Sequence, residues 1–170
     1  GVTNLGDIKL TSETTEIEGL PEGVTVINDV AAFQGGYAVA CGPEAKLLYV
    51  KDGKTQVIAE FPEEQVFTLL GGEGQNHLYI GLSGETARVV VITKNDLPDG
   101  DELIDIDALP MIYELEEEQY IFDLTSSRGH MAGMPRNLFV ATGPHGRVYQ
   151  FVFREADSEP TVILDAEQPN

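Results

Sequence analysis

Residues 138–148 read Leu-Phe-Val-Ala-Thr-Gly-Pro-His-Gly-Arg-Val, and two earlier stretches repeat their pattern. Residues 37–47 read Tyr-Ala-Val-Ala-Cys-Gly-Pro-Glu-Ala-Lys-Leu, and residues 78–89 read Leu-Tyr-Ile-Gly-Leu-Ser-Gly-Glu-Thr-Ala-Arg-Val. Each copy is an alternating apolar run, a glycine turn, a basic residue and the start of a second apolar run. Alternation with a period of two around such a turn is typical of a β-hairpin.

A second repeated feature follows each hairpin. Ile58, Ile112 and Ile163 lie in apolar runs that pass into acidic junctions, and they recur at intervals of 54 and 51 residues. Further apolar runs follow the first two junctions, at residues 66–70 and 120–124. A repeat of this length built only of strands is typical of the four-stranded blades of a β-propeller.

We therefore predict an all-β fold of β-propeller blades in one segment that spans residues 1–170. A β-sandwich also has many short strands, but its strands need not repeat in sequence. Residues 8–20 are expected to form one extra N-terminal strand, the outer strand of a preceding blade. The three predicted four-stranded antiparallel repeats are residues 24–61, 66–115 and 120–165.

Residues 137–151 resemble the NHL type of propeller repeat, with an apolar strand, a small polar turn, an arginine and a strand that ends in an aromatic residue. The chain has no Trp, so the Trp-Asp signature of WD40 blades is absent, and its Gly-Gly pairs fall short of a kelch pattern. The resemblance implies a ring of six or more blades. The remaining blades are expected in a longer polypeptide, which the ends of the chain within the repeat favour, or in a second copy of the chain.

The composition is strongly acidic, with 29 Asp and Glu against 10 Lys and Arg and a net charge of -19. Such a surface repels phosphate groups, so neither nucleic acid nor an anionic membrane is an expected partner. No apolar stretch approaches the roughly 18 residues that span a bilayer, and the first ten residues lack a signal-peptide pattern. Cys41 is the single cysteine, which excludes an internal disulfide. The compartment stays open, with an extracytoplasmic location weighed slightly above a cytoplasmic one.

Three basic residues, Lys46, Arg88 and Arg147, occupy equivalent positions at the start of the third strand of each repeat. The propeller resemblance places these positions on a face where ligands commonly bind. In a closed ring they would form a circle of cations that holds an anionic group, arginine through paired hydrogen bonds. The alternative is that each cation pairs with an acid of the Glu-rich junctions in a weak surface ion pair.

Two insertions interrupt the repeat and are expected on one face, opposite the cations. Residues 94–109 contain Asp96, Asp99 and Asp101, which resemble part of a calcium loop because a hard cation needs clustered carboxylates around a tight turn. Calcium is thus the one cofactor that the sequence suggests, and a solvated acidic loop is the alternative.

The second insertion, residues 126–136, contains Arg128, His130 and Arg136 in an otherwise acidic chain. These residues are expected either to dock against the acidic loop or to contact an acidic partner.

No catalytic residue is predicted, since the chain lacks a Gly-x-Ser-x-Gly elbow, a His-Glu-x-x-His pair and a phosphate-binding Gly-Lys-Ser/Thr loop. His145 lies in a turn where the other copies have Glu44 and Thr86, so it is not a repeated ligand. We expect a non-catalytic binding or interaction scaffold that presents loops to a protein, peptide or glycan. The alternatives are part of a propeller hydrolase or lyase with a metal at the central channel, and a purely structural segment of a larger surface or assembly protein.

Overall fold

The computed structural model describes most of the chain as β-structure. The described residues are 19–62, 64–100, 102–127, 130–131, 134–153 and 159–166, without the side chains of Glu73, His130, Met131, Met134 and Pro135. Twelve strands form three four-stranded antiparallel sheets. The prediction of three such sheets is therefore confirmed, whereas the predicted strand at residues 8–20 lies almost wholly outside the described residues.

Each sheet is built from strands close together in the chain. Sheet 1 consists of β1 (Val26–Phe33), β2 (Gly36–Gly42), β3 (Lys46–Lys51) and β4 (Lys54–Glu60). Sheet 2 consists of β5 (Gln65–Gly71), β6 (His77–Ser83), β7 (Ala87–Thr93) and β8 (Met111–Leu115). Sheet 3 consists of β9 (Tyr120–Ser126), β12 (Asn137–Gly143), β13 (Arg147–Val152) and β14 (Thr161–Asp165). The short elements are β10 (His130–Met131), β11 (Met134–Pro135) and the 3-10 turns η1 (Glu73–Gln75), η2 (Lys94–Asp96) and η3 (Ile106–Ala108).

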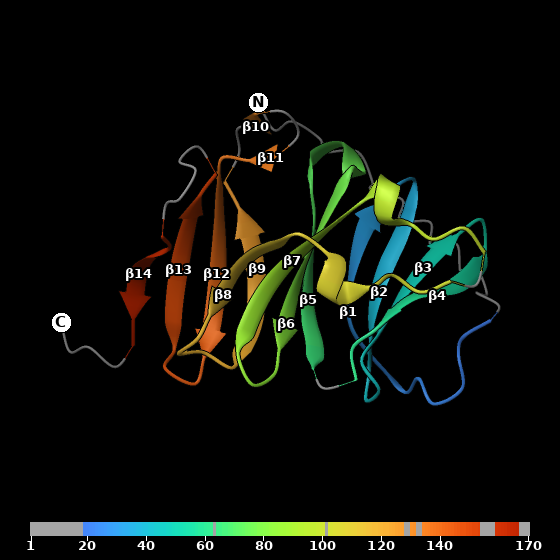
Figure 1. Ribbon diagram of the computed structural model, residues 1–170, viewed down its shortest axis with the longest axis horizontal. Helices are drawn as coiled ribbons and strands as arrows, with labels where there is room; N and C mark the ends of the chain where they lie inside the picture. The colour runs from blue at the N-terminus through green and yellow to red at the C-terminus, as the bar shows by residue number, and fades with distance from the viewer. Residues whose placement is uncertain are drawn as a thin grey trace, which may run out of the picture.

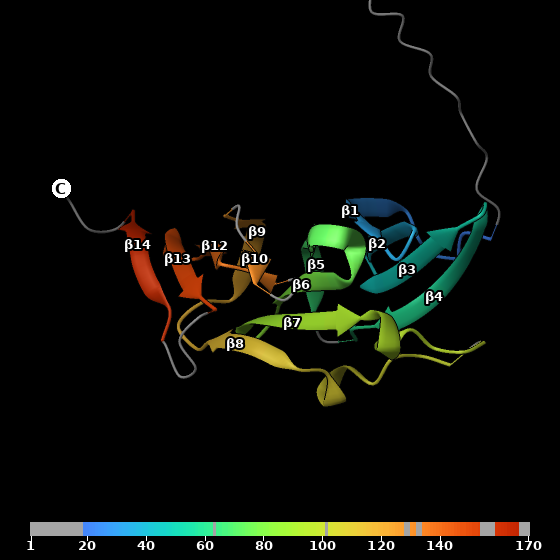
Figure 2. The same ribbon diagram turned by 90° about the horizontal axis from the view of Figure 1, so that it is seen from above.

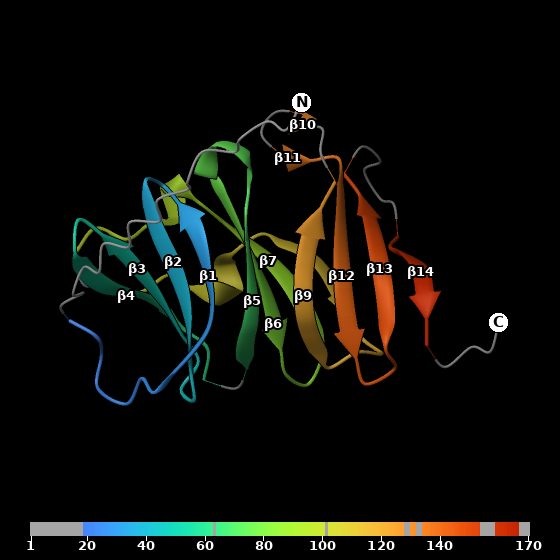
Figure 3. The same ribbon diagram turned by 180° about the vertical axis from the view of Figure 1, so that it is seen from behind.

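The three sheets lie side by side in chain order, with the face of each against the next (Figure 1). The first strands, β1, β5 and β9, run next to one another and are called the inner strands (Figure 3). The last strands, β4, β8 and β14, spread away from them like a fan and are called the outer strands (Figure 2). Among the described residues, no helix is long and apolar enough to cross a bilayer.

The strand register repeats from sheet to sheet. The pairs Val26 with Gly42, Gln65 with Ser83 and Tyr120 with Gly143 are equivalent, and each inner strand then has one bulged residue, at Asn28, Phe67 or Phe122. The outer pair of every sheet also has one bulge, and its residue is Ile58, Ile112 or Ile163. The isoleucines that mark the repeat in sequence are therefore bulge residues, which bend a strand and increase its twist.

Two apolar cores join the sheets. Sheets 1 and 2 bury a cluster that includes Phe33, Leu47 and Ile80, and sheets 2 and 3 bury one that includes Tyr79 and Ile121. Because burial of apolar surface is the dominant favourable term in folding, the burial of both faces of sheet 2 stabilises the arrangement of the three sheets.

A hydrogen bond from backbone to side chain also links each pair of neighbouring sheets. The Leu69 N–H of sheet 2 donates to Asp29 Oδ2 of sheet 1 at 2.7 Å. The Leu124 N–H of sheet 3 donates to Thr68 Oγ1 of sheet 2 at 3.3 Å. Both N–H groups lie on strands at the edge of their sheets, where alternate backbone groups have no ladder partner.

Replacement of Gly81 by alanine tests the close approach of sheets 2 and 3. An added Cβ would lie 2.7 Å from Ile121 Cγ2 and 2.9 Å from Thr68 Cγ2. We expect a decrease of about 1–3 kcal/mol in the free energy of unfolding, because overpacking displaces the neighbouring strand. Chemical denaturation measures the change. Gly42→Ala, whose Cβ would contact nothing closer than 3.7 Å, is the control, and an equal loss in both variants would contradict this explanation.

Replacement of Tyr79 by phenylalanine tests a buried hydroxyl that has no hydrogen-bond partner among the described residues. Burial raises the pKa of Tyr79 from 10.0 to about 12. The neutral phenol therefore contributes stability that is fully present below pH 10 and is lost as the pH rises towards 12. We expect Tyr79→Phe to raise the free energy of unfolding by about 1 kcal/mol and to remove this alkaline loss.

Tyr49→Phe is the matched control, because the Tyr49 hydroxyl donates a hydrogen bond of 2.9 Å to the Gln34 carbonyl. It should lower the free energy of unfolding by about 1 kcal/mol. Denaturation at several pH values compares the two variants, and a similar loss in both would show that the Tyr79 hydroxyl is satisfied.

Candidate functional site: the turn edge of the sheets

The turns β2–β3, β6–β7 and β12–β13 lie along one edge of the three sheets, the lower edge in Figure 1, which we call the turn edge. The junctions β4–β5 and β8–β9 lie at the same edge. Lys46, Arg88 and Arg147 lie at the starts of β3, β7 and β13, so the structure brings the three predicted cations to one edge.

Each of these cations faces an acid across the sheet. The register pairs Lys46 with Glu60, Arg88 with Glu114 and Arg147 with Asp165. The repeat thus contains an acidic position on the outer strand opposite the basic one. Opposite charges at directly paired positions stabilise a sheet by up to about 1 kcal/mol in exposed positions.

Lys46 and Arg88 illustrate two kinds of ion pair. Lys46 Nζ lies 3.0 Å from Glu44 Oε2 and 3.7 Å from Glu60 Oε1. Arg88 donates two hydrogen bonds to the carboxylate of Glu64 in the β4–β5 junction, at 2.9 Å and 2.8 Å. These hydrogen bonds raise the pKa of Lys46 and of Arg88. The junction between sheets 1 and 2 is therefore held to sheet 2 by a bidentate pair.

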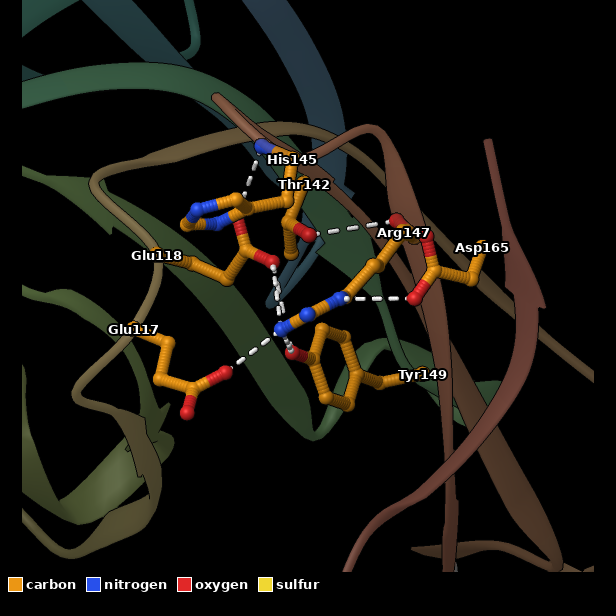
Figure 4. A network of polar contacts seen from close by, with 7 residues as sticks. All are labelled: Glu117, Glu118, Thr142, His145, Arg147, Tyr149 and Asp165. Atoms are coloured by element: carbon orange, nitrogen blue, oxygen red, sulfur yellow. Dashed lines mark hydrogen bonds and ion pairs between the residues drawn. The ribbon is translucent and has the colours of Figure 1, made fainter. Parts of the chain in front are cut away.

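Arg147 has the largest set of partners (Figure 4). Its Nη1 donates to Tyr149 Oη at 3.4 Å and to Glu117 Oε2 at 2.6 Å, and its Nε donates to Asp165 Oδ2 at 3.2 Å. The hydrogen bonds to Tyr149 and Glu117 raise the pKa of Arg147. Arg147 thereby connects sheet 3 with the β8–β9 junction.

Glu118 is the buried acid of this network, with a side chain that is 0% exposed. Its carboxylate accepts from the Tyr149 hydroxyl at 3.3 Å and the His145 backbone N–H at 3.5 Å, and it lies 3.7 Å from Arg147 Nη1. The His145 ring is also near, with Nδ1 3.6 Å from Glu118 Oε2. A carboxylate withdrawn from water needs such partners, so sequence reasoning, which gave Glu118 no particular role, missed a central residue.

The described contacts favour the ion-pair interpretation of Lys46, Arg88 and Arg147 over a circle of free cations. An anionic ligand would have to displace the acids that already occupy these side chains. The other predicted binding residues stay untested. Arg136 is exposed, the side chain of His130 is not described, and Arg128 lies outside the described residues.

The acidic insertion after β7 follows a different course from the one expected. The Gln56 side chain on β4 donates to the Gly100 carbonyl, and the Ile104 N–H donates to the Ile58 carbonyl at 2.8 Å. The segment therefore crosses the outer strand of sheet 1 and brings Asp105 and Asp107 beside Arg88. Its expected position wholly opposite the cations is wrong, because Ile104 and Ile106 pack against the core between sheets 1 and 2.

The suggested calcium loop stays a prediction. Asp96 Oδ2 accepts from the backbone N–H and the hydroxyl of Thr93, both at 2.7 Å, in a capping box of η2. Asp99 is exposed, and Asp101 lies outside the described residues. In the part of the chain that the structure describes, no group of three His, Cys, Asp or Glu residues is arranged to hold a metal ion.

An open groove of about 540 Å³ lies at the turn edge between sheets 1 and 2. Its apolar floor includes Phe61, Ile104 and Ile106, and the one basic residue among the described residues that line it is Arg88, which Glu64 already pairs. The acids that line it are Glu60, Glu64, Glu85, Asp105, Asp107 and Glu114. The groove therefore combines a surplus of negative charge with an apolar surface.

Fold and site together define an all-β protein of three face-packed antiparallel sheets with a charged turn edge. A scan against protein-family models and a search of curated proteins find no match to this chain.

The two neighbouring glutamates beside Arg147 give a matched test of this network. Glu118→Gln should lower the free energy of unfolding by about 1–3 kcal/mol, because a buried charged acceptor is lost. Glu117 makes the shorter contact, at 2.6 Å, but is 73% exposed. Glu117→Gln should therefore change stability by less than about 1 kcal/mol. Thermal or chemical unfolding compares the variants, and a larger effect at Glu117 would contradict the assignment.

Proposed function

We propose that this chain is three consecutive blades of a β-propeller, similar to the NHL type, and that it acts as a non-catalytic binding scaffold. Support comes from three four-stranded sheets with one register, the same two bulges and a common order of inner and outer strands. Face-to-face packing of such sheets about neighbouring inner strands is the arrangement expected of propeller blades.

The groove at the turn edge is the binding site of this scaffold. Its ligand is a basic segment of a protein or peptide, because the described residues that line the groove include six acids and one arginine, which is already paired. Lysine and arginine have apolar stems and charged heads. The stems fit against Ile104 and Ile106, both half-buried, while the heads meet Glu85 and Asp107.

Electrostatics favour the same class of ligand. The net charge of -19 attracts cationic partners over long distances and speeds their association. The groove concentrates this charge at one place, since Asp105 and Asp107 reach the turn edge only because the insertion crosses β4. Hydrogen bonds to β4 hold the insertion that carries these two acids, which lowers the cost of ordering them on binding.

A labelled peptide rich in lysine and arginine tests this function by fluorescence anisotropy. We expect it to bind more tightly than an acidic peptide of the same length and to weaken as salt rises. The double variant Glu85→Gln with Asp107→Asn should lose about 2- to 30-fold in affinity, because each exposed pair contributes about 0.2–1 kcal/mol.

The matched control is Asp52→Asn with Asp99→Asn, which removes two exposed acids near the opposite edge. Asparagine tolerates the positive φ of residue 52. Equal weakening in both double variants would show that the peptide senses only net charge, and the groove assignment would then be wrong.

A further inference from the structure

The hydrogen bond between neighbouring sheets recurs at one position of the repeat. Asp29, Thr68 and Asp123 are equivalent, because each follows the inner-strand bulge and pairs with a small residue of the second strand. The small residues are Ala40, Gly81 and Ala141. Asp29 and Thr68 accept backbone N–H groups of the next sheet.

Asp123 is the third member of this series, and it is exposed on the free face of sheet 3. Among the described residues, no group donates a hydrogen bond to its carboxylate. Phe139, Ala141 and Val148 share this face by the alternation of the strands and are partly exposed. Sheet 3 therefore presents an acceptor and apolar side chains to a sheet that would come next.

Sheet 1 presents the complementary features along its inner strand β1, at the other end of the molecule. On the same face, β2 and β3 already bury a cluster against Val24 and Val57 within the chain: Val39, Cys41, Leu48 and Val50. Val30 is equivalent to Leu69 and Leu124, but its N–H donates to the adjacent Asp29 Oδ1 at 2.7 Å. Its side chain is 56% exposed, whereas Leu69 and Leu124 are 6% and 4% exposed. Val30 of sheet 1 therefore carries the exposed apolar side chain that Leu69 and Leu124 bury against a neighbouring sheet, and its N–H is bonded only within its own strand.

A second pair of positions shows the same complementarity. Ile121 of sheet 3 lies over Gly81 of sheet 2, and its equivalent Val66 lies in the same core cluster as Ala40. Val66 and Ile121 are 0% exposed, but the equivalent Ile27 of sheet 1 is 61% exposed. Ala141 offers the corresponding small position on sheet 3.

We propose that the free face of sheet 3 docks against the inner strand β1 of sheet 1 in a second copy of this chain, with the two inner strands side by side as in the contacts of β1 with β5 and of β5 with β9. The Val30 N–H of the second copy exchanges Asp29 Oδ1 for the carboxylate of Asp123, and Ile27 packs over Ala141. The contact is head-to-tail, so two or more copies form a closed ring or an open chain. It uses no residue of the groove and does not depend on the proposed ligand.

Light scattering and sedimentation of the full chain over a range of concentrations measure this association. We expect a mass that is an integer multiple of the chain at high concentration. Both copies are strongly acidic, so association should strengthen as salt rises, opposite to the binding of the basic peptide. A chain that stays monomeric at every concentration and salt would overturn the proposal.

Three variants locate the contact. Ile27→Asp and Ala141→Asp place a charge on opposite sides of it and should each abolish association. Met111→Asp makes the same charge change at a residue of sheet 2 that is 51% exposed, and it should leave the mass unchanged. A cooperative transition in chemical denaturation confirms that each variant is folded.

Mixing the two disrupted variants identifies the head-to-tail geometry. The Ile27→Asp copy keeps an intact sheet 3 face, and the Ala141→Asp copy keeps an intact sheet 1 face, so the mixture should regain one contact and form pairs. Association through sheet 1 against sheet 1 would instead be abolished by Ile27→Asp, unaffected by Ala141→Asp and not restored by mixing. That result would overturn the proposal while leaving the groove untouched.

Discussion

Contact between the face of one sheet and the face of the next is the interaction on which this structure depends. A four-stranded sheet alone leaves the apolar side chains of both faces in water and loses the hydrophobic contribution that their burial makes to folding. Sheet 2 has no face left exposed in this way, because Phe33 and Leu47 lie in the core on one side and Ile121 in the core on the other. Close approach requires small side chains, and Gly81 meets this requirement below Ile121. The polar link at Thr68 then satisfies a backbone group that the close approach would otherwise bury unpaired.

The ion pairs at the turn edge complement this packing, because they fix the junctions between sheets. Glu64 lies between sheets 1 and 2 and pairs with Arg88, and Glu117 and Glu118 lie between sheets 2 and 3 and pair with Arg147. In a chain with a net charge of -19, each such cation also relieves repulsion among neighbouring acids. The buried Glu118 is the most demanding of these residues, since it needs several donors to compensate for lost water.

The sheets were predictable because their signals are local. Alternation, glycine turns and the spacing of Ile58, Ile112 and Ile163 all lie within or between adjacent strands. The equivalence of the three cations was predictable for the same reason.

The acid that pairs with each cation was not predictable, because Glu64 and Arg88 meet only through the geometry of a junction and a hairpin. The groove was hidden likewise, since it requires residues 104–107 to cross β4. The position that accepts a backbone N–H from the next sheet was not recognisable from sequence, because Asp29, Thr68 and Asp123 differ in residue type. The small residues that pair with it in the sheets, Ala40, Gly81 and Ala141, do align in the sequence repeat.

The two proposals are connected by symmetry. The superposition of sheet 1 on sheet 2, and of sheet 2 on sheet 3, keeps the β2–β3, β6–β7 and β12–β13 turns on the same edge. If a second copy is added by the same operation, its acidic groove lies on the same edge as the first groove. A partner with two basic segments could then engage both grooves, and the second contact would form at the high effective concentration set by the linker between the segments. Because individual exposed ion pairs are weak, this doubling would turn a groove of modest affinity into a selective binding surface.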